Sequence, residues 1–193
     1  PLFLNPNIGQ NIFNGDLWFT TGSGGGDGQQ GSYQYTGRPI PTALGVPFPT
    51  PSQIYNDSTT GHQLINSTAD IAVSPSGLIA YVTDDRPVSG DGFIGGMHRW
   101  EKIAGVWTFM YQMKTGLRDD GAKFTCRHVE VDWSGAVPVI YTTTSSALSE
   151  GSDRVRYFYK TSDTGAGSPF VLLAQSQVNF MFMGIRFGLI SDP

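Results

Sequence analysis

Short runs of apolar and β-favouring residues follow one another along most of this chain, separated by turns rich in glycine, aspartate and proline. Between residues 70 and 113 there are four such runs, at 70–73, 78–83, 96–100 and 106–111. Short runs of this kind predict β-strands, and the Gly- and Asp-containing stretches between the runs predict tight turns. We therefore expect this part of the chain to form a unit of four short strands.

The four-run pattern repeats downstream, and its first part also occurs upstream. The aromatic residues Trp18, Tyr81 and Tyr141 mark the expected second strand of each repeat and lie 63 and 60 positions apart. Four strands followed by a repeat at a steady period are typical of propeller blades. The predicted fold class is all-β, as a β-propeller portion of about three four-stranded blades plus the first strand of another, part of a larger ring.

The predicted blades span about residues 8–57, 69–118 and 124–175, and the first strand of a further blade spans 179–190. The polar stretch of about 56–68 is a linker that carries possible glycan acceptors. Propellers usually contain about 4 to 8 blades, so three blades do not close a ring. We expect the remaining blades of the propeller to come from the same precursor or from other chains. The sequence opens without methionine, which favours a processed or larger parent protein.

The composition argues against some classes of binding partner. Charged residues make up 15% of the chain, the net charge is −4, and basic residues do not cluster, so nucleic acid is not an expected partner. The sequence has no run of 18 apolar residues, so we predict no membrane span. No cofactor motif is recognisable. The single cysteine, Cys126, is expected to be a buried structural thiol, with a nucleophilic role beside His128 as the alternative.

Two N-glycosylation sequons lie in the polar linker. They are Asn56-Asp57-Ser58 and Asn66-Ser67-Thr68, and about one sequon is expected by chance in a chain of this composition. A glycan is readily accommodated on such a polar stretch. We therefore predict glycosylation at Asn56 and Asn66 and an extracellular, secreted protein.

Candidate catalytic residues follow from the repeat alignment. The first strand of a propeller blade lines the central channel, and ligands often bind at the channel mouth. The alignment places Asp70, His128, Glu130 and Arg186 on the channel-facing side of successive first strands. If the protein is an enzyme, His128 and Glu130 would be its acid and base, and Asp70 and Arg186 would orient the substrate. The competing interpretation is a hydrated channel whose charges pair with one another.

Three carboxylates, Asp84, Asp85 and Asp91, lie in the predicted loop after the second strand of the middle blade. Such a set could bind Ca²⁺. The alternating Asp/Asn register of a calcium loop is missing, however, so turn capping or pairing with Arg86 is the alternative. These three residues are weak metal candidates.

Part of the chain resembles a known family. The matching stretches are 95–100, 106–111, 131–135, 138–144 and 163–170, in the order and spacing of that family. Over roughly residues 77 to 188 the chain is similar to a largely uncharacterised family of secreted β-propeller proteins. The resemblance implies an extracellular propeller of which this chain is the C-terminal portion, and it carries over no catalytic residues. The loop 163–170 is also similar to the Asp-box turns of sialidase-type propellers, which stabilise the fold, although its spacing to the aromatic residue is longer.

The sequence as a whole favours a non-enzymatic extracellular β-propeller glycoprotein. We expect a structural or binding module, with glycans as one class of partner and self-assembly into a larger complex or fibre as another. Tryptophans at 18, 100, 107 and 133 are expected to pack between blades, and an exposed one could stack on a sugar. The alternative function is a channel-mouth hydrolase or lyase that uses the set Asp70, His128, Glu130 and Arg186.

Overall fold

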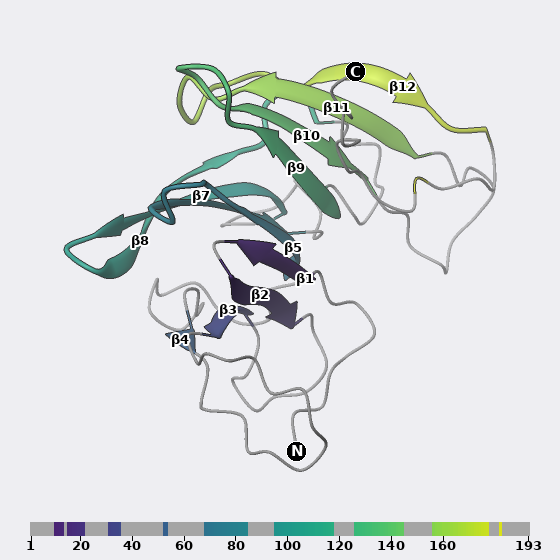
Figure 1. The fold of residues 1–193 in the computed structure, drawn as a ribbon. Helices are drawn as coiled ribbons and strands as arrows, with labels where there is room; N and C mark the ends of the chain where they lie inside the picture. Colours follow the sequence, from purple (N-terminus) through teal and green to yellow (C-terminus); the bar gives the residue numbers. More distant parts are fainter. Residues whose placement is uncertain are drawn as a thin grey trace, which may run out of the picture.

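The computed structural model describes residues 10–13, 15–21, 31–35, 52–53, 68–84, 95–117, 126–144, 156–177 and 182. Across these residues the regular elements are β-strands without any helix, and they form three four-stranded antiparallel sheets (Figure 1). The prediction of an all-β protein is confirmed. Since the described part of the chain contains no helix, it also contains none long and apolar enough to cross a membrane.

Each sheet is built from four strands that are consecutive in the sequence and adjacent in space. The first sheet contains β1 (Gln10–Phe13), β2 (Asp16–Thr21), β3 (Gly31–Tyr35) and β4 (Ser52–Gln53). The second contains β5 (Thr68–Val73), β6 (Ile79–Asp84), β7 (Gly96–Ile103) and β8 (Val106–Met113). The third contains β9 (His128–Asp132), β10 (Val139–Thr143), β11 (Tyr157–Ser162) and β12 (Val171–Gln175).

The second sheet lies between the other two. Its first strand, β5, contacts β1 and β2 on one side and β9 on the other, so the first strands of the three sheets are neighbours (Figure 1). Every residue of β5 is buried, because both faces of this strand are packed. The marker residues Trp18, Tyr81 and Tyr141 lie on β2, β6 and β10, the second strand of each sheet, as predicted.

Alternation along β5 and β6 divides the core into two layers. Between the first and second sheets, the buried residues are Trp18, Ile71, Val73, Ala80, Val82 and Trp100. Between the second and third sheets, the larger cluster includes Ala72, Tyr81, Met97, Val129, Ile140 and Phe170, together with the buried thiol of Cys126. Burial of one large apolar side chain contributes about 1.5–3 kcal/mol, so these layers are the main attraction between the sheets.

Aromatic pairs cross both layers, as expected for the tryptophans. The rings of Trp18 and Trp107 meet edge to face with centroids 5.9 Å apart, which joins the first sheet to the second. The rings of Tyr81 and Trp133 stack at 5.5 Å and join the second sheet to the third. Each such pair contributes about 0.5–1.5 kcal/mol of stability beyond the contribution from burying its surface area.

Candidate ligand-binding site

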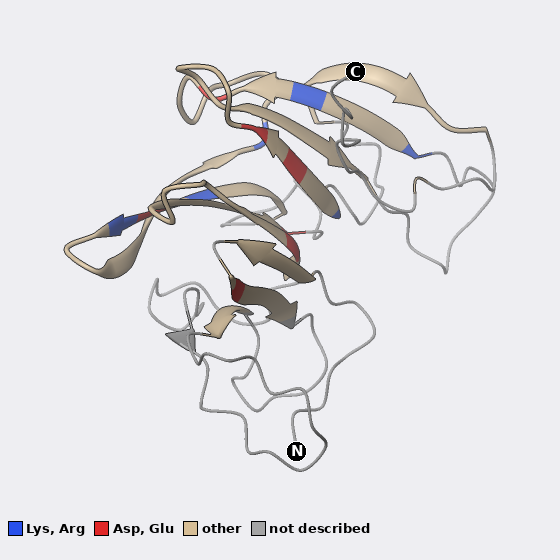
Figure 2. Cartoon of the chain, in the orientation of Figure 1, with Lys and Arg blue, Asp and Glu red and all other residues tan. Residues whose placement is uncertain are grey.

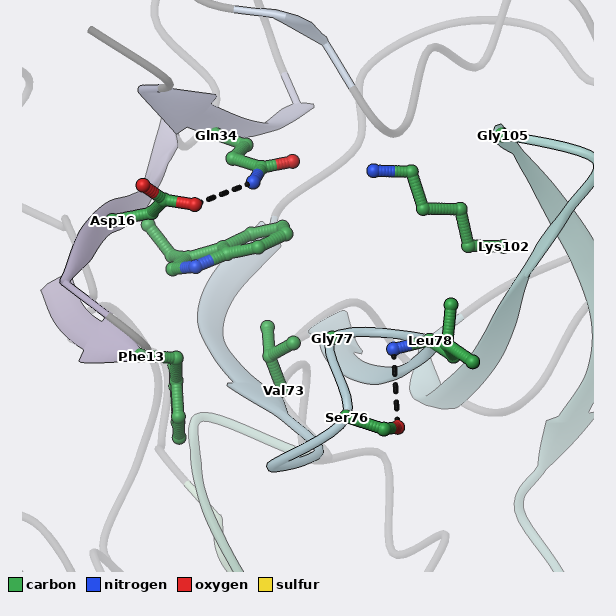
Figure 3. Close-up of a pocket in the computed structure, with 10 residues that line it drawn as sticks. Phe13, Asp16, Gln34, Val73, Ser76, Gly77, Leu78, Lys102 and Gly105 are labelled. Carbon is green, nitrogen blue, oxygen red and sulfur yellow. Dashed lines mark hydrogen bonds between the residues drawn. The ribbon is translucent and has the colours of Figure 1, made fainter. Parts of the chain in front are cut away.

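A pocket of about 420 Å³ lies between the first and second sheets (Figure 3). Its volume falls in the range of about 300–1,000 Å³ that is typical of small-molecule sites. The residues that line it are Phe13, Asp16, Trp18, Gln34, Val73, Ser76, Gly77, Leu78, Lys102 and Gly105. They combine aromatic and aliphatic side chains with a few convergent polar groups, which is the usual composition of a binding site.

The polar wall of the first sheet is formed by Asp16 and Gln34. Gln34 is the cross-strand partner of Trp18, and Asp16 precedes Trp18 by two residues, so all three side chains share one face of the sheet. The side-chain amide of Gln34 donates a 3.0 Å hydrogen bond from Nε2 to Asp16 Oδ2. This bond fixes the amide and leaves Gln34 Oε1 without a hydrogen bond from any described residue.

The opposite wall comes from the β7–β8 hairpin and from the turn between β5 and β6. Lys102 pairs with Trp107 across the hairpin, and its Nζ lies 5.7 Å from the centroid of the Trp107 ring. Figure 3 shows the side chains of Gln34 and Lys102 extending toward each other across the pocket. No carboxylate of the described residues forms an ion pair with Lys102.

The turn at residues 74–78 is held by its own backbone. The amide of Gly77 donates a 2.8 Å hydrogen bond to the carbonyl of Ser74, and Gly77 has a φ of 71°. Glycine suits this left-handed conformation because it has no Cβ. The turn places Ser76 and the half-exposed Leu78 on the pocket wall.

The base of the pocket is apolar. Trp18 is 2% exposed and Val73 is fully buried. The indole N–H of Trp18 has no hydrogen-bond partner in the part of the chain that the structure describes. A buried donor without a partner costs free energy.

Charge is sparse around this site. Figure 2 shows few charged residues on the described strands, with basic residues on β7 and β11 and acidic residues on β2 and β9. Among the described residues that line the pocket, Asp16 is the only acidic one and Lys102 the only basic one. Asp16 lies on the first sheet and Lys102 on the second.

Two of the predicted channel residues do lie close together. Asp70 Oδ2 and His128 Nδ1 are 3.7 Å apart, on the neighbouring first strands β5 and β9. Asp70 is buried, and its two carboxylate oxygens accept hydrogen bonds from the backbone amides of Ile71 (2.9 Å) and Val129 (3.2 Å). The carboxylate thus joins two sheets through backbone groups.

The structure does not place the other two members of the predicted set, Glu130 and Arg186, in contact with Asp70 and His128. Glu130 is half-buried on β9, two residues from His128, and it pairs with Tyr141 on β10. Arg186 lies outside the described residues. Convergence of all four side chains on one site therefore stays a prediction.

The metal and glycan predictions mostly concern residues beyond the described ranges. Asp84 is buried at the end of β6, whereas Asp85, Asp91, Asn56 and Asn66 are not described. Within the described ranges, no group of three or more His, Cys, Asp or Glu side chains is arranged to hold a metal ion. Both the metal and the glycosylation predictions remain open.

A charged cluster that the sequence did not reveal joins the second and third sheets. Asp163, directly after β11, accepts hydrogen bonds from the hydroxyls of Tyr81 and Tyr111 and from the guanidinium of Arg99. The Tyr111 bond is 2.7 Å long, and Arg99 also binds Glu101 at 2.6 Å. Three donors from β6, β7 and β8 therefore converge on one buried carboxylate of the neighbouring sheet.

Burial and hydrogen bonding shift the pKa values of this cluster in opposite directions. Burial on its own raises the pKa of Asp163, but the hydrogen bonds from Tyr81, Tyr111 and Arg99 outweigh it and lower the pKa below its ordinary value. Burial, together with the hydrogen bond to Asp163, raises the pKa of Tyr111 to about 12. The same two causes raise the pKa of Tyr81 further. The cluster is consequently an ion pair with two neutral phenols at neutral pH.

Comparisons with models of protein families, with curated proteins and with solved structures gave no match. The function must accordingly be argued from the site itself. The sequence did contain one signal for the pocket: Asp16 and Trp18 are spaced by two residues on a predicted strand, which places them on one face. Nothing in the sequence indicated that Lys102, 86 positions further on, would face them.

Proposed function

We propose that this chain is part of a secreted β-propeller that serves as a non-enzymatic binding module, and that the pocket between the first two sheets binds a glycan. The observation that carries the proposal is the lining of this pocket. The apolar side chains of Phe13 and Leu78 line the pocket between a carboxylate–amide pair on one wall and the ammonium of Lys102 on the other. Sugars have apolar ring faces and hydroxyl rims, and this combination of groups suits both.

The propeller part of the proposal is supported by the way the sheets follow one another. All three are four-stranded meanders, and their first strands β1, β5 and β9 are neighbours in sequence order. A sheet stack of this kind extends naturally by adding further four-stranded sheets. We propose that the remaining blades come from the same precursor or from other chains, in a larger assembly or fibre.

The secreted, glycosylated character rests on the two sequons at Asn56 and Asn66 and on the resemblance to secreted propeller proteins. It is tested by producing the chain in a secreting eukaryotic cell. We expect the intact mass to exceed 20.9 kDa and to fall on treatment with N-glycosidase. A mass that the glycosidase leaves unchanged would contradict this part of the proposal.

The alternative of a channel-side hydrolase or lyase has one observation in its favour, the 3.7 Å approach of Asp70 and His128. Both oxygens of Asp70 already accept backbone hydrogen bonds, which favours a structural role for this carboxylate. A turnover assay with Glu130→Gln separates the two functions. Loss of a measured hydrolytic activity in this variant would support the enzyme.

The binding function is tested by applying the labelled chain to an array of neutral and acidic glycans. We expect selective retention of a few glycans, and we expect Gln34→Leu to abolish it because this change removes the amide from the pocket wall. The matched control is Glu130→Gln on the channel side, which should leave retention unchanged. Retention that survives Gln34→Leu but is lost in Glu130→Gln would place the ligand on the channel side and overturn the assignment of the pocket.

A further inference from the structure

We infer that the pocket selects glycans that carry an anionic group, either the carboxylate of a uronic acid or a sulfate ester, and that Lys102 is the residue that makes this selection. The inference rests on the proposed glycan-binding function and adds a charge requirement to it. It follows from the position and the surroundings of Lys102, because the other polar groups of the pocket suit any sugar.

Lys102 is a half-buried cation on the wall of the pocket. Its Nζ lies over the ring of Trp107 at 5.7 Å from the centroid, and it extends into the pocket (Figure 3). The aromatic face favours the ammonium in this position without neutralising its charge. No carboxylate of the described residues pairs with it, so the ammonium can form an ion pair with a ligand.

The opposite end of the pocket suits hydroxyl donors, which favours one orientation of the ligand. Asp16 accepts a hydrogen bond from Gln34 there. A sugar hydroxyl could donate to a carboxylate oxygen, whereas a ligand carboxylate or sulfate has no proton to donate. We therefore place the hydroxyl rim of the sugar at Asp16 and Gln34 and its anionic group at Lys102.

The apolar base separates a sugar from a simple anion. Phe13 and Leu78 offer hydrophobic surface but no charge, so a free inorganic ion would leave this surface unused. A pyranose ring would cover it. An acidic peptide side chain is the other class of occupant, and N-acetyl-glutamate amide represents it among the test ligands.

The test is a set of calorimetric titrations of the full chain. The ligands are methyl β-D-glucuronide, methyl β-D-glucoside, the 6-sulfate of that glucoside, N-acetyl-glutamate amide and sodium sulfate. We expect the glucuronide or the sulfated glucoside to bind about tenfold more tightly than the neutral glucoside at low salt. This preference should shrink at high salt, because the pair is only partly buried.

The decisive variant is Lys102→Met, which keeps the length of the side chain and removes the charge. It should abolish the preference for the anionic sugars and leave the affinity for the neutral glucoside within about twofold. The matched control is Lys160→Met, because Lys160 also places its Nζ over an aromatic ring, that of Tyr141 at 5.9 Å, but on the third sheet. This control should bind all ligands as the unchanged chain does, and thermal melting should show that both variants are folded.

Each outcome decides the inference. A preference that is lost only in Lys102→Met supports it, and the stronger of the two anionic sugars identifies the anionic group. Equal affinities for anionic and neutral sugars would overturn the charge requirement while leaving the glycan-binding proposal standing. Tighter binding of N-acetyl-glutamate amide or sodium sulfate than of any sugar would overturn both, as would the absence of binding by every sugar.

Discussion

The backbone amide of Val129 donates a 3.2 Å hydrogen bond to the carboxylate of Asp70, 59 residues earlier in the chain. Asp70 lies on β5 and Val129 on β9, so this bond connects the first strands of two different sheets. On the other side of β5, the hydroxyl of Thr20 on β2 donates a 3.1 Å bond to the carbonyl of Ala69. The inner ends of the sheets are thus joined by polar bonds in addition to their apolar layers.

Removal of the Asp70 carboxylate should loosen this junction. We expect Asp70→Ala to lower the free energy of unfolding by about 2–3 kcal/mol, because the amides of Ile71 and Val129 lose a buried acceptor. Asp70→Asn keeps one carbonyl oxygen and should cost about half as much. Urea unfolding measures the difference, and hydrogen exchange should show the amide of Val129 losing protection. Unchanged protection of Val129 in Asp70→Ala would contradict this role.

The cluster around Asp163 predicts a loss of stability in acid. Its pKa is lower in the folded chain than the value of about 3.9 expected in the unfolded chain. The contribution of its hydrogen bonds is therefore complete above about pH 4 and is lost as the pH falls through the lower folded pKa. Urea midpoints between pH 6 and pH 2 should fall steeply at the acid end.

The variant that tests this cluster is Asp163→Asn. We expect this variant to be about 2–3 kcal/mol less stable at pH 6, because Arg99 loses its buried partner. Its stability should also fall less than that of the unchanged chain as the pH is lowered from 6 to 2. Tyr111→Phe removes only one of the donors and should have a smaller effect in the same direction. If Asp163→Asn kept the full acid dependence, other carboxylates would have to be responsible.

Much of the fold could be predicted from the sequence because its strands are short apolar runs bounded by turn residues. The runs around Tyr81 and Tyr141 have apolar residues on both strand faces and polar turns at their ends, and both form strands. The two-residue strand Ser52–Gln53 could not be found, since a segment so short has no period. The third strand of the last sheet, Tyr157–Ser162, ends in the polar residues Lys160 to Ser162, whose place in the strand is fixed by pairing with β10 and not by an apolar pattern.

The candidate site could be predicted only in part, for a different physical reason. Asp16 and Trp18 share a strand face, which a period of two indicates. Lys102 and Asp163 gain their roles from contacts between sheets, and sheet packing is not encoded in the local pattern. Asp70 and His128, which the repeat alignment places at equivalent positions, lie 3.7 Å apart on neighbouring first strands.

The approach of two loops at Gly116 gives a test of the packing between the second and third sheets. Gly116 has a φ of 81°, and a Cβ at this position would lie 2.5 Å from the carbonyl oxygen of Phe170. We expect Gly116→Ala to destabilise the chain by about 3 kcal/mol, through both backbone strain and the clash. Thermal or urea unfolding measures the effect.

The matched control is Gly77→Ala. Gly77 also has a positive φ, 71°, but a Cβ there would meet no atom within 4 Å. Gly77→Ala should therefore lower the free energy of unfolding only by the backbone strain, which is about 1–2 kcal/mol. Equal losses in the two variants would mean that the contact with Phe170 contributes nothing.

The most direct test of the binding function is a nuclear magnetic resonance titration of the ¹⁵N-labelled chain with methyl β-D-glucuronide. The pocket predicts that the indole N–H of Trp18 and the side-chain amide of Gln34 shift together and saturate at one ligand per chain. Resonances of β9, including those of His128 and Glu130, should stay in place. Shifts confined to β9, or no saturable shift at Trp18 and Gln34, would contradict the assignment of the pocket as the binding site.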